Sequence, residues 1–531
     1  MGARMIGHNA SLKSARPPAS RAPALGDLAR GVRLERAGDL AGALAAYEAA
    51  HARAPDDPDI LAALAALAAR LEMREAAARL WAEVARLRPE RLEAVDGEAQ
   101  ALRELGRFDE AVDRLRHALL THPEEPRLWN SLGVTLTQDG QAQVAITFLD
   151  EAVRLDPRFA AALYNRGAAR FDLGQLALAH ADFGQAARAA KTAAEAAAIA
   201  FARSTLLLAR GDLATGWEAY ETRLSRRWPK ASVFEAPGRR WRPADTLRGK
   251  RLLIVAEQGL GDELMFASVL PDVTEALGPE GALSLAVDPR LVSLFSRSFP
   301  AAQVSAHATG RLGPRNLRSA PDVAAPRGVD LWAPMGSLPR RFRPSLRDFP
   351  AAHGYLRPDP RRVAHWRAWL GDGPAAVGVT WRSGKLAGDR RRQYPPLSLW
   401  APLLRTPGLR FVNLQYGDCA DELADLAARA GTPILEPPGL DLRDDLEGLA
   451  ALTVALDLTL VVSNATAALA GACGAPLAVI GGPANWTRLG TDAYPWYPQA
   501  QAFNTASFGD WAPAMDAAAE RLTRLAAGRP A

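Results

Sequence analysis

The feature that most constrains the fold is a repeat of 34 residues in the N-terminal part of the chain. Four columns of the repeat each hold one kind of residue. One column holds proline, at Pro55, Pro89, Pro123 and Pro157, and another holds a turn residue, at Gly38, Glu72, Gly106, Gly140 and Gly174. A third holds alanine, at Ala43, Ala77, Ala111, Ala145 and Ala179, and a fourth holds a large apolar side chain, at Tyr47, Trp81, Leu115, Leu149 and Phe183. A fixed small residue lets two helices approach closely, and the large one fills the seam between neighbouring hairpins. The pattern predicts stacked helical hairpins, each ended by proline.

These columns resemble the tetratricopeptide repeat (TPR). Five repeats are expected over residues 25–191, and a looser sixth unit over residues 192–228 is expected to cap the stack. Residues 1–24, rich in Ala, Ser, Arg and Pro, are expected to be a disordered leader. The resemblance implies a concave surface that binds a protein or peptide. The alternative is an array that only dimerises or supports the second half of the chain.

After a linker at residues 229–250, short apolar runs alternate with helical patterns. Strands are expected at residues 252–256, 283–287, 331–333, 376–381, 409–414, 433–435, 458–462 and 476–480, and helices at 445–456, 467–473 and 511–526. Such alternation predicts parallel α/β units. An irregular, Pro- and Arg-rich stretch at 300–375 divides them, so we expect two Rossmann-like domains, at 251–360 and 361–531, that face a cleft.

The first candidate site follows the strand at residues 252–256. Gly259, Gly261 and Asp262 form a turn into a helix, an arrangement at which α/β sheets bind anionic ligands. Leu264 stands where a dinucleotide fingerprint has its third glycine, which disfavours NAD. Asp262 is placed to accept a proton from a hydroxyl group, or, alternatively, to cap the helix. Glu257 is the reserve candidate for the base.

The second cluster lies where strands of the last domain end. Its members are Arg382, Ser383 and Lys385; Gln415; Ser463, Asn464 and Thr466; and Gly482. The first group suits phosphate binding, or is an exposed basic loop. The third begins a helix of very small residues, where free backbone N–H groups bind an anion, or where the helix is simply capped and buried. Gln415 is placed to read a base or ribose, or to cap a turn, and Gly482 allows close approach of a ligand.

Composition excludes several functions. The eight histidines show no ligand spacing, Cys419 and Cys473 are too few for a thiolate site, and no Gly-x-Ser-x-Gly elbow occurs, so metal-independent chemistry without a bound cofactor is expected. There is neither a signal peptide nor an apolar run of about eighteen residues, which predicts a cytoplasmic protein without membrane insertion. Residues 291–392 hold 18 Lys and Arg against 6 Asp and Glu. This excess suits an acidic small ligand, or is simply a solvated basic face. Nucleic acid is disfavoured because aromatic residues are not interleaved.

The second half resembles GT-B glycosyltransferases, specifically the bacterial group related to the heptosyltransferases. Residues 259–262 with Leu270 and Pro271 are similar to that family's G-D…L-P signature, which implies that Asp262 is the general base. Ser383 and Lys385 match its donor-phosphate residues. Residues 463–474 match its donor motif with three replacements: Ser463 for aspartate, Asn464 for the hydroxylic residue and Ala468 for histidine.

The whole layout resembles the TPR-fused protein glycosyltransferases of alphaproteobacteria, including those that modify flagellin. The shared motifs are Gly-Asp-x-x-x-Gly-Trp-x-x-Tyr-Glu at 211–221, Glu-Gln-Gly-Leu-Gly-Asp, Trp-Arg-Ser-Gly, Phe-Val-Asn-Leu-Gln-Tyr-Gly, and Gly-Thr-Asp…Pro-Trp-Tyr-Pro at 490–498. The implied fold is an N-terminal TPR α-solenoid followed by a two-Rossmann-domain GT-B glycosyltransferase. The implied reaction is inverting transfer of a nonulosonic acid from a CMP donor to Ser/Thr of flagellin held by the TPR array.

Three alternatives stay open at this point. The chain could be a catalytically inactive TPR adaptor or chaperone for flagellin, which the replacements at Ser463 and Ala468 favour. It could be a heptosyl- or hexosaminyl-transferase that uses ADP or UDP donors. A glycolipid transferase is disfavoured, because a lipid acceptor does not need a TPR array.

Overall fold

The structure is a computed structural model that describes residues 21–228, 231–313, 315–322, 328–351, 353–384 and 392–528. The chain divides into two compact units, Met1–Pro123 and Glu124–Ala531. The division lies inside the repeats, so the later repeats belong to the same unit as the sheets. Residues 1–20 of the expected leader lie outside the described residues, and the next four already belong to the first helix.

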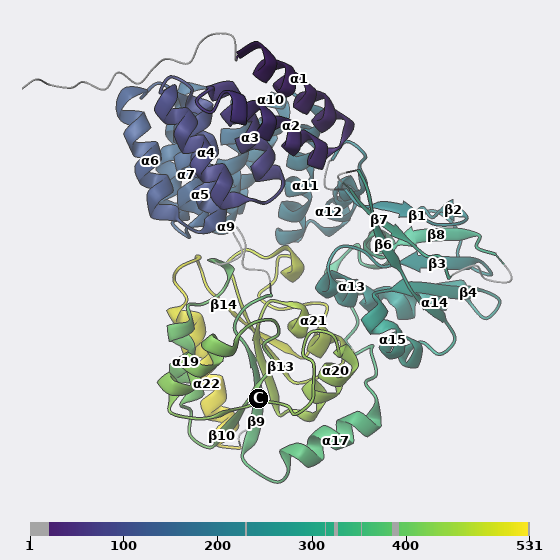
Figure 1. Ribbon diagram of the computed structural model, residues 1–531. Coiled ribbons are helices and arrows are strands. Elements are labelled where there is room, and N and C mark those ends of the chain that lie inside the picture. The colour runs from purple at the N-terminus through teal and green to yellow at the C-terminus, as the bar shows by residue number, and fades with distance from the viewer. Residues whose placement is uncertain are drawn as a thin grey trace, which may run out of the picture. The chain divides into compact units, whose positions relative to one another are not determined.

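The first unit consists of three helical hairpins (Figure 1). Its helices are α1 (Arg21–Ala37), α2 (Leu40–Arg53), α3 (Pro58–Arg70), α4 (Arg74–Leu87), α5 (Leu92–Leu105) and α6 (Phe108–Thr121). Within each hairpin the turn residue is left-handed, with φ of +86° at Gly38, +59° at Glu72 and +77° at Gly106. This conformation ends a helix and favours glycine, which explains the glycine column. The alanines of the next column are fully buried where the helices meet.

The second unit begins with three further hairpins. They are formed by α7 (Pro126–Gln138), α8 (Ala142–Leu155), α9 (Ala160–Asp172), α10 (Leu176–Ala189), α11 (Ala193–Ala209) and α12 (Leu213–Tyr220), with a 3-10 helix, Glu221–Leu224, directly after them. Left-handed glycines again form the turns, at Gly140, Gly174 and Gly211. The hairpins predicted from the 34-residue period are therefore confirmed along the whole helical part.

A five-stranded parallel sheet follows, with strand order β2-β8-β3-β4-β5. The strands are β2 (Arg239–Arg240), β3 (Arg251–Val255), β4 (Ala282–Val287), β5 (Gln303–Ala306) and β8 (Leu331–Pro334). Leu252 and Ile254 face a core shared with the helices α13 (Leu260–Phe266), α14 (Leu270–Leu277) and α15 (Val292–Ser298). Leu253 and Val255 face the opposite side, where Phe234 and Trp332 also pack.

A small sheet contributes Phe234 to that opposite side. It consists of β1 (Val233–Glu235), β7 (Arg315–Ser319) and β6 (Ala308–Leu312) in the order β1-β7-β6. Two expectations are corrected here. The linker at 229–250 contains β1 and β2, and the stretch at 300–375, expected to be irregular, contains β5 to β8, α16 (Pro339–Phe342) and α17 (Pro360–Leu370). Of these strands, β8 was expected at residues 331–333. Strands β1, β2, β5 and β6 are short edge strands with few buried residues, and β7 is short and only partly buried, so they lack the apolar alternation that would have revealed them.

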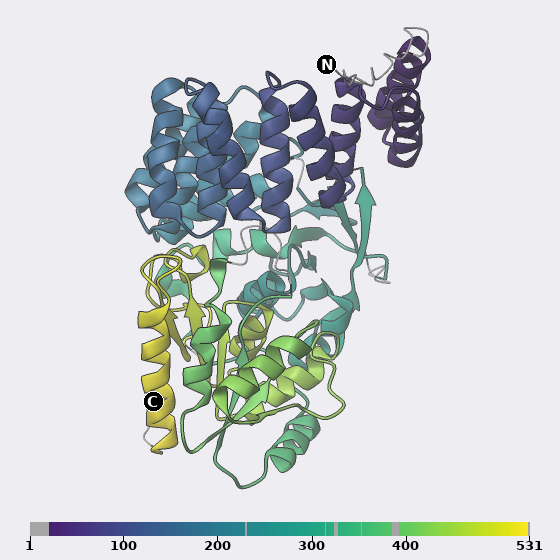
Figure 2. The same ribbon diagram turned by 60° about the vertical axis from the view of Figure 1, so that its left-hand side comes forward.

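The last sheet has six parallel strands in the order β11-β10-β9-β12-β13-β14. They are β9 (Ala375–Thr380), β10 (Leu409–Asn413), β11 (Ile434–Leu435), β12 (Leu458–Val462), β13 (Leu477–Gly481) and β14 (Ala500–Asn504). The helices α18 (Trp400–Leu404), α19 (Ala420–Ala430) and α22 (Ala512–Ala526) share one core with it, and α20 (Leu446–Ala455) and α21 (Ala465–Ala472) lie in the other (Figure 2). The parallel sheets predicted from alternation are confirmed.

The strand order of the last sheet fixes the place of a site. Chain order reverses between β9 and β12, and ligands of open α/β sheets bind outside the carboxyl ends of the strands at such a point. The segments that leave β9 and β12 there are residues 381–384 and 463–464. Helix α21, which follows, packs against α13 of the first sheet. The carboxyl ends of β3 and β12 are thereby brought near each other.

Candidate functional site

The turn that follows β3 is strained and held from two sides. Gln258 has φ of +62°, a left-handed conformation that is uncommon for a residue with a side chain. Its side-chain amide donates a 2.7 Å hydrogen bond to the hydroxyl of Tyr220, which ends α12. The guanidinium of Arg318 on β7 donates to the backbone carbonyl of Gln258 at 2.6 Å. The turn is therefore fixed by residues from the last helical hairpin and from the small sheet.

Asp262 lies at the N-terminus of α13, just after this turn. Its Oδ2 accepts a hydrogen bond from the backbone N–H of Gly259 at 3.1 Å, so the carboxylate caps the helix. A carboxylate at this place also interacts favourably with the N-terminal end of the helix dipole. The side chain is partly exposed. Capping and proton acceptance, the two roles considered for Asp262, use the same group in the same place.

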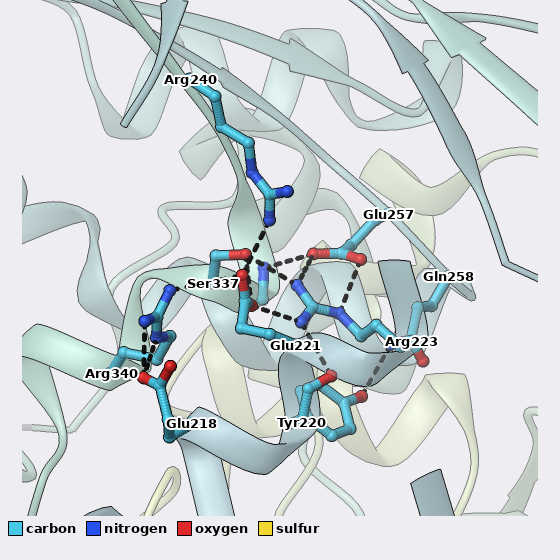
Figure 3. Close-up of polar contacts among 10 residues, drawn as sticks. Glu218, Tyr220, Glu221, Arg223, Arg240, Glu257, Gln258, Ser337 and Arg340 are labelled. Atoms are coloured by element: carbon cyan, nitrogen blue, oxygen red, sulfur yellow. Dashed lines mark hydrogen bonds and ion pairs between the residues drawn. The ribbon is translucent and has the colours of Figure 1, made fainter. Parts of the chain in front are cut away.

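Glu257 is held by a buried ion pair (Figure 3). It is 1% exposed and accepts hydrogen bonds from Arg223 Nε at 3.0 Å, Arg223 Nη2 at 2.6 Å and the N–H of Gly336 at 2.8 Å. Arg223, 3% exposed, also donates to Ser337 Oγ at 3.0 Å. Burial opposes the charge of Arg223, but the carboxylates of Glu257 and Glu221 outweigh it and raise its pKa. Both oxygens of Glu257 are thus engaged, which favours a structural role over proton transfer.

Further ion pairs continue this network toward the surface. Glu221 accepts hydrogen bonds at 2.7 Å each from Arg223, Ser337 and Arg240. Burial opposes its charge, yet these donors hold the pKa of its carboxyl below the ordinary value. Arg340 donates to Glu218 at 2.8 Å at the exposed end (Figure 3). The end of the helical hairpins and the strand ends of the first sheet are therefore joined by charge.

An aromatic cluster joins the same segments to the last domain. The ring of Trp217 on α12 lies 6.3 Å from Phe266 of α13, 6.3 Å from Trp486 and 6.0 Å from Trp496, centroid to centroid. Its indole N–H donates to the carbonyl of Arg343 at 2.9 Å. Such ring pairs contribute beyond the area they bury. The last hairpin is thus part of the core of the α/β region.

The small-residue helix α21 meets the glycine turn. A Cβ on Gly261 would lie 3.7 Å from Cα of Ala465, an ordinary van der Waals distance, so the glycine turn lies next to the start of α21. Asn464 caps α21 through the N–H of Ala467 at 3.1 Å, and its amide donates to Thr380 Oγ1 at 2.9 Å. Thr466 is buried in the first turn of the helix. The structure therefore brings Gly261 of the glycine turn next to Ala465, which lies between the predicted residues Asn464 and Thr466.

Two other predicted donor residues, Arg382 and Gln415, are engaged within the protein. Arg382 donates to the carboxylate of Glu422 at 2.7 and 2.8 Å, so this guanidinium has an internal anion. The buried Gln415 accepts from the N–H groups of Trp381 and Arg382 at 3.0 and 3.1 Å, the turn-capping alternative. Ser383 follows directly, and Lys385 lies outside the described residues.

Gly482 is enclosed on both sides by residues of the loops after β13 and β14. The ring of Phe508 occupies the place where a side chain on Gly482 would be. The carbonyl of Gly482 accepts a hydrogen bond from Arg488 Nη2 at 3.2 Å. Arg488 is a buried residue that sequence reasoning missed, and burial lowers its pKa.

In the described part of the chain, no group of three or more His, Cys, Asp or Glu side chains is placed to hold a metal ion. Nor is any described helix long and apolar enough to cross a membrane.

Comparisons with known proteins identify the repeat and a family. The family model of the tetratricopeptide repeat matches residues 97–158. Protein FlbA of Caulobacter vibrioides is 47% identical over 496 residues, which cover 93% of this chain and 83% of FlbA. The chain belongs to the FlbA family. It is also 33% identical to the peroxisomal targeting signal receptor of Eremothecium gossypii, over 67 residues that cover 13% of this chain and 12% of the receptor.

Two of the solved structures that are similar to this FlbA-family chain match about a third of it. MamA of Desulfovibrio magneticus RS-1 is 21% identical with a TM-score of 0.28 and covers 31% of this chain and 94% of its own. The TPR protein TTC0263 of Thermus thermophilus is 21% identical with a TM-score of 0.30 and covers 35% and 99%. The assignment of the hairpins to the tetratricopeptide repeat rests on the family model and on the period of the sequence.

A buried acid lies directly beside Asp262 in the FlbA-family chain. Glu263 accepts a hydrogen bond from the N–H of Asp288 at 2.8 Å, and burial raises the pKa of its carboxyl to about 8. Its Oε2 is 3.9 Å from Nε2 of His307. Burial, followed by the charge of Arg318, lowers the pKa of His307 to about 4. Near neutral pH both side chains are therefore uncharged, and Asp262 is the other acidic residue in the first turn of α13.

Proposed function

We propose that this FlbA-family chain is a GT-B glycosyltransferase that transfers a sugar to Ser/Thr of a protein held by its TPR hairpins. The observation that carries the proposal is the approach of Gly261, at the start of α13 after β3, to Ala465 of α21, after β12. Two parallel sheets that bring their carboxyl ends together give a site for two substrates. The resemblance of the glycine turn and of residues 463–474 to glycosyltransferase motifs supplies the reaction class.

In the proposed reaction the acceptor hydroxyl oxygen attacks the anomeric carbon of the donor sugar. The bond between that carbon and the phosphate oxygen breaks, the leaving nucleotide takes the electron pair, and Asp262 takes the hydroxyl proton. The helix start at Ser463, Asn464 and Thr466, with Lys385, would bind the donor phosphate. We propose a CMP-linked nonulosonic acid as donor and flagellin as acceptor, on the resemblance to flagellin-modifying enzymes.

Substitution of Asp262 by asparagine tests the base. Asparagine keeps a cap for α13 but cannot take the proton, so we expect transfer to flagellin to fall about 10²–10⁴-fold with flagellin binding unchanged. The matched control is Asp39→Asn, which makes the same change at another helix cap, where Asp39 accepts from Gly42 at 2.9 Å. Transfer at the wild-type rate by Asp262→Asn would remove Asp262 from the role of base.

The donor is tested by thermal shift with CMP, CDP, UDP, ADP and GDP. A ligand that binds only the folded form stabilises it by about 2.7 kcal/mol at a hundred times its dissociation constant. Stabilisation by CMP alone supports the nonulosonate donor. Stabilisation by UDP or ADP instead supports hexosaminyl or heptosyl transfer.

A second candidate function is a TPR adaptor for flagellin without catalysis. The observation that favours it is the internal engagement of Arg382 by Glu422 and of Gln415 by backbone N–H groups, which takes two predicted donor contacts out of use. An adaptor binds flagellin but is not stabilised by any of the five nucleotides at millimolar concentration. That result, together with transfer unaffected by Asp262→Asn or never detected, would select the adaptor.

A further inference from the structure

We propose that Tyr220 and Arg223, at the end of the last helical hairpin, are positioning residues that set the conformation of the turn carrying Asp262. The proposal rests on the proposed function for its catalytic consequence. The proposal goes beyond the proposed function by assigning part of the catalytic apparatus to the repeat array. The turn is residues 257–262, and the two positioning residues lie 34 or more residues before it in the chain.

The contacts reach the two residues that precede the glycines (Figure 3). The Tyr220 hydroxyl accepts a hydrogen bond from the amide of Gln258 at 2.7 Å, and Arg223 holds both carboxylate oxygens of Glu257 at 2.6 and 3.0 Å. Arg223 also lies over the ring of Tyr220, 4.7 Å from its centroid. The two positioning residues therefore act as one unit on consecutive residues of the turn.

The turn requires such external support because of its backbone. Gln258 is held at φ of +62°, and a non-glycine residue keeps that conformation only where its surroundings determine it. Two groups do so at Gln258, the Tyr220 hydroxyl and the Arg318 guanidinium. Glu257 in turn is buried and needs a cation, which Arg223 supplies with the planar fork that fits a carboxylate. Removing the hairpin contacts would let the turn relax and move Asp262.

The first test is Tyr220→Phe, with Tyr47→Phe as the matched control. Tyr47 is also a buried tyrosine of the repeats, and its hydroxyl donates to Glu35 at 2.7 Å. The full-length proteins are compared by hydrogen exchange of the peptide that contains residues 257–262. We expect exchange of that peptide to be about tenfold faster in Tyr220→Phe, the factor for one lost hydrogen bond, and unchanged in Tyr47→Phe. Equal exchange in the two variants would overturn the proposal.

The second readout separates positioning from general stability. In Tyr220→Phe we expect kcat for transfer to fall about tenfold while the KM for the donor stays within twofold, because donor binding does not use the turn's support. Gln258→Leu should give the same loss, and the double variant should be no worse than either single one, since both remove the same hydrogen bond. Additive losses would overturn the pairing of Tyr220 with Gln258.

Arg223→Lys tests the ion pair while conserving charge. Lysine keeps the cation but loses the bidentate geometry, so exchange in the peptide should accelerate with the fold retained, as checked by circular dichroism.

Should the turn loosen in these variants while the wild type transfers no sugar from any donor, the positioning proposal stands and the proposed function fails. Should the wild type transfer sugar and Tyr220→Phe match Tyr47→Phe in exchange and kcat, the positioning proposal fails alone.

Discussion

The fifth and sixth hairpins share a period but pack their seam residues differently. In the fifth, Phe183 lies over Gly167, where an added Cβ would be 2.8 Å from its ring. In the sixth, 34 residues on, the glycine position holds Phe201 and Trp217 takes the place of Phe183. Trp217 contacts Phe266 and the tryptophans of the last domain instead. The change from Gly167 to Phe201 at the matching position thus accompanies a change of contact. The large aromatic residue of the fifth hairpin packs inside its own hairpin, whereas that of the sixth packs against the α/β region.

The ion pairs of the first unit's hairpins also differ from those of the sixth hairpin. In the first unit, Arg86 pairs with Glu83 and Arg107 with Glu110 on exposed helix surfaces. In the sixth hairpin Arg223 pairs with Glu257 out of solvent. Exposed pairs contribute about 0–1 kcal/mol, whereas breaking a buried pair leaves an uncompensated charge. The sixth hairpin is therefore sensitive to substitutions that the first ones tolerate.

The largest expected effect comes from Trp217→Ala. Loss of the buried indole, its ring contacts and its hydrogen bond should lower the free energy of unfolding by about 5 kcal/mol, and should accelerate exchange in the turn at residues 257–262. Phe183→Ala, the control one repeat earlier, should cost about 3 kcal/mol and leave the turn unchanged, because a repeat contacts only its neighbours. Urea unfolding and hydrogen exchange measure both. Faster exchange of residues 257–262 in Phe183→Ala would mean that support of the turn is not specific to the sixth hairpin.

A second expected effect concerns the buried acid of the α/β region. The folded-state pKa of Glu263 is about 8, above its unfolded value, so the folded protein keeps a proton that the unfolded one has lost, and this stability is lost as pH rises toward 8. The pKa of His307 is lowered to about 4, so its contribution makes stability rise with pH, but only below pH 6.5, where the unfolded histidine is protonated. From pH 6.5 to 8, Glu263→Gln should therefore gain about 2 kcal/mol relative to wild type.

Unfolding midpoints measured along that pH range check this expectation. Glutamine can still accept the N–H of Asp288, so only the charge is removed. The same substitution at Glu75, exposed on the first turn of α4, is the control, and its stability relative to wild type should stay constant. A constant difference for Glu263→Gln as well would show that this acid is not buried in a neutral form.

The smallest expected effect is at Glu72, the glutamate of the glycine column. It is left-handed, with φ of +59°, a conformation that glycine adopts without steric cost. Glu72→Gly should therefore stabilise the first unit by about 0.5–1 kcal/mol. Glu83→Gly, inside α4, should destabilise it by about 1 kcal/mol. Thermal unfolding separates the two signs, and destabilisation by Glu72→Gly would contradict the turn geometry.

Several parts of the fold could be predicted from the sequence because local pattern decides them. The turn column is left-handed at Gly38 and even at Glu72, as a helix end requires. The buried strands β3, β12 and β13 were recognised from short apolar runs, since a strand covered on both faces has few polar residues. The edge strand β6 and its neighbour β7 could not be recognised, because exposed or partly buried side chains along both strands carry no apolar alternation.

The candidate site was predicted only in outline. Its residues were found because they follow strands, but their engagement depends on partners far away in the chain. Arg382 pairs with Glu422, 40 residues on, and Glu257 with Arg223, 34 residues before it. Nothing in the motif around Asp262 indicated that Tyr220 would hold the neighbouring Gln258.

The sequence alone determined the repeat period, the turn conformations and the positions of the buried strands, since each depends on residues within a few positions of one another. Tertiary structure alone decided which carboxylates are paired, buried or partly exposed around the turn after β3. The reason is physical: hydrogen bonds and burial act between segments that only folding brings together. Glu257, Asp262 and Glu263 stand close together in the sequence, yet one is ion-paired, one caps a helix at the surface, and one is buried with a pKa of about 8.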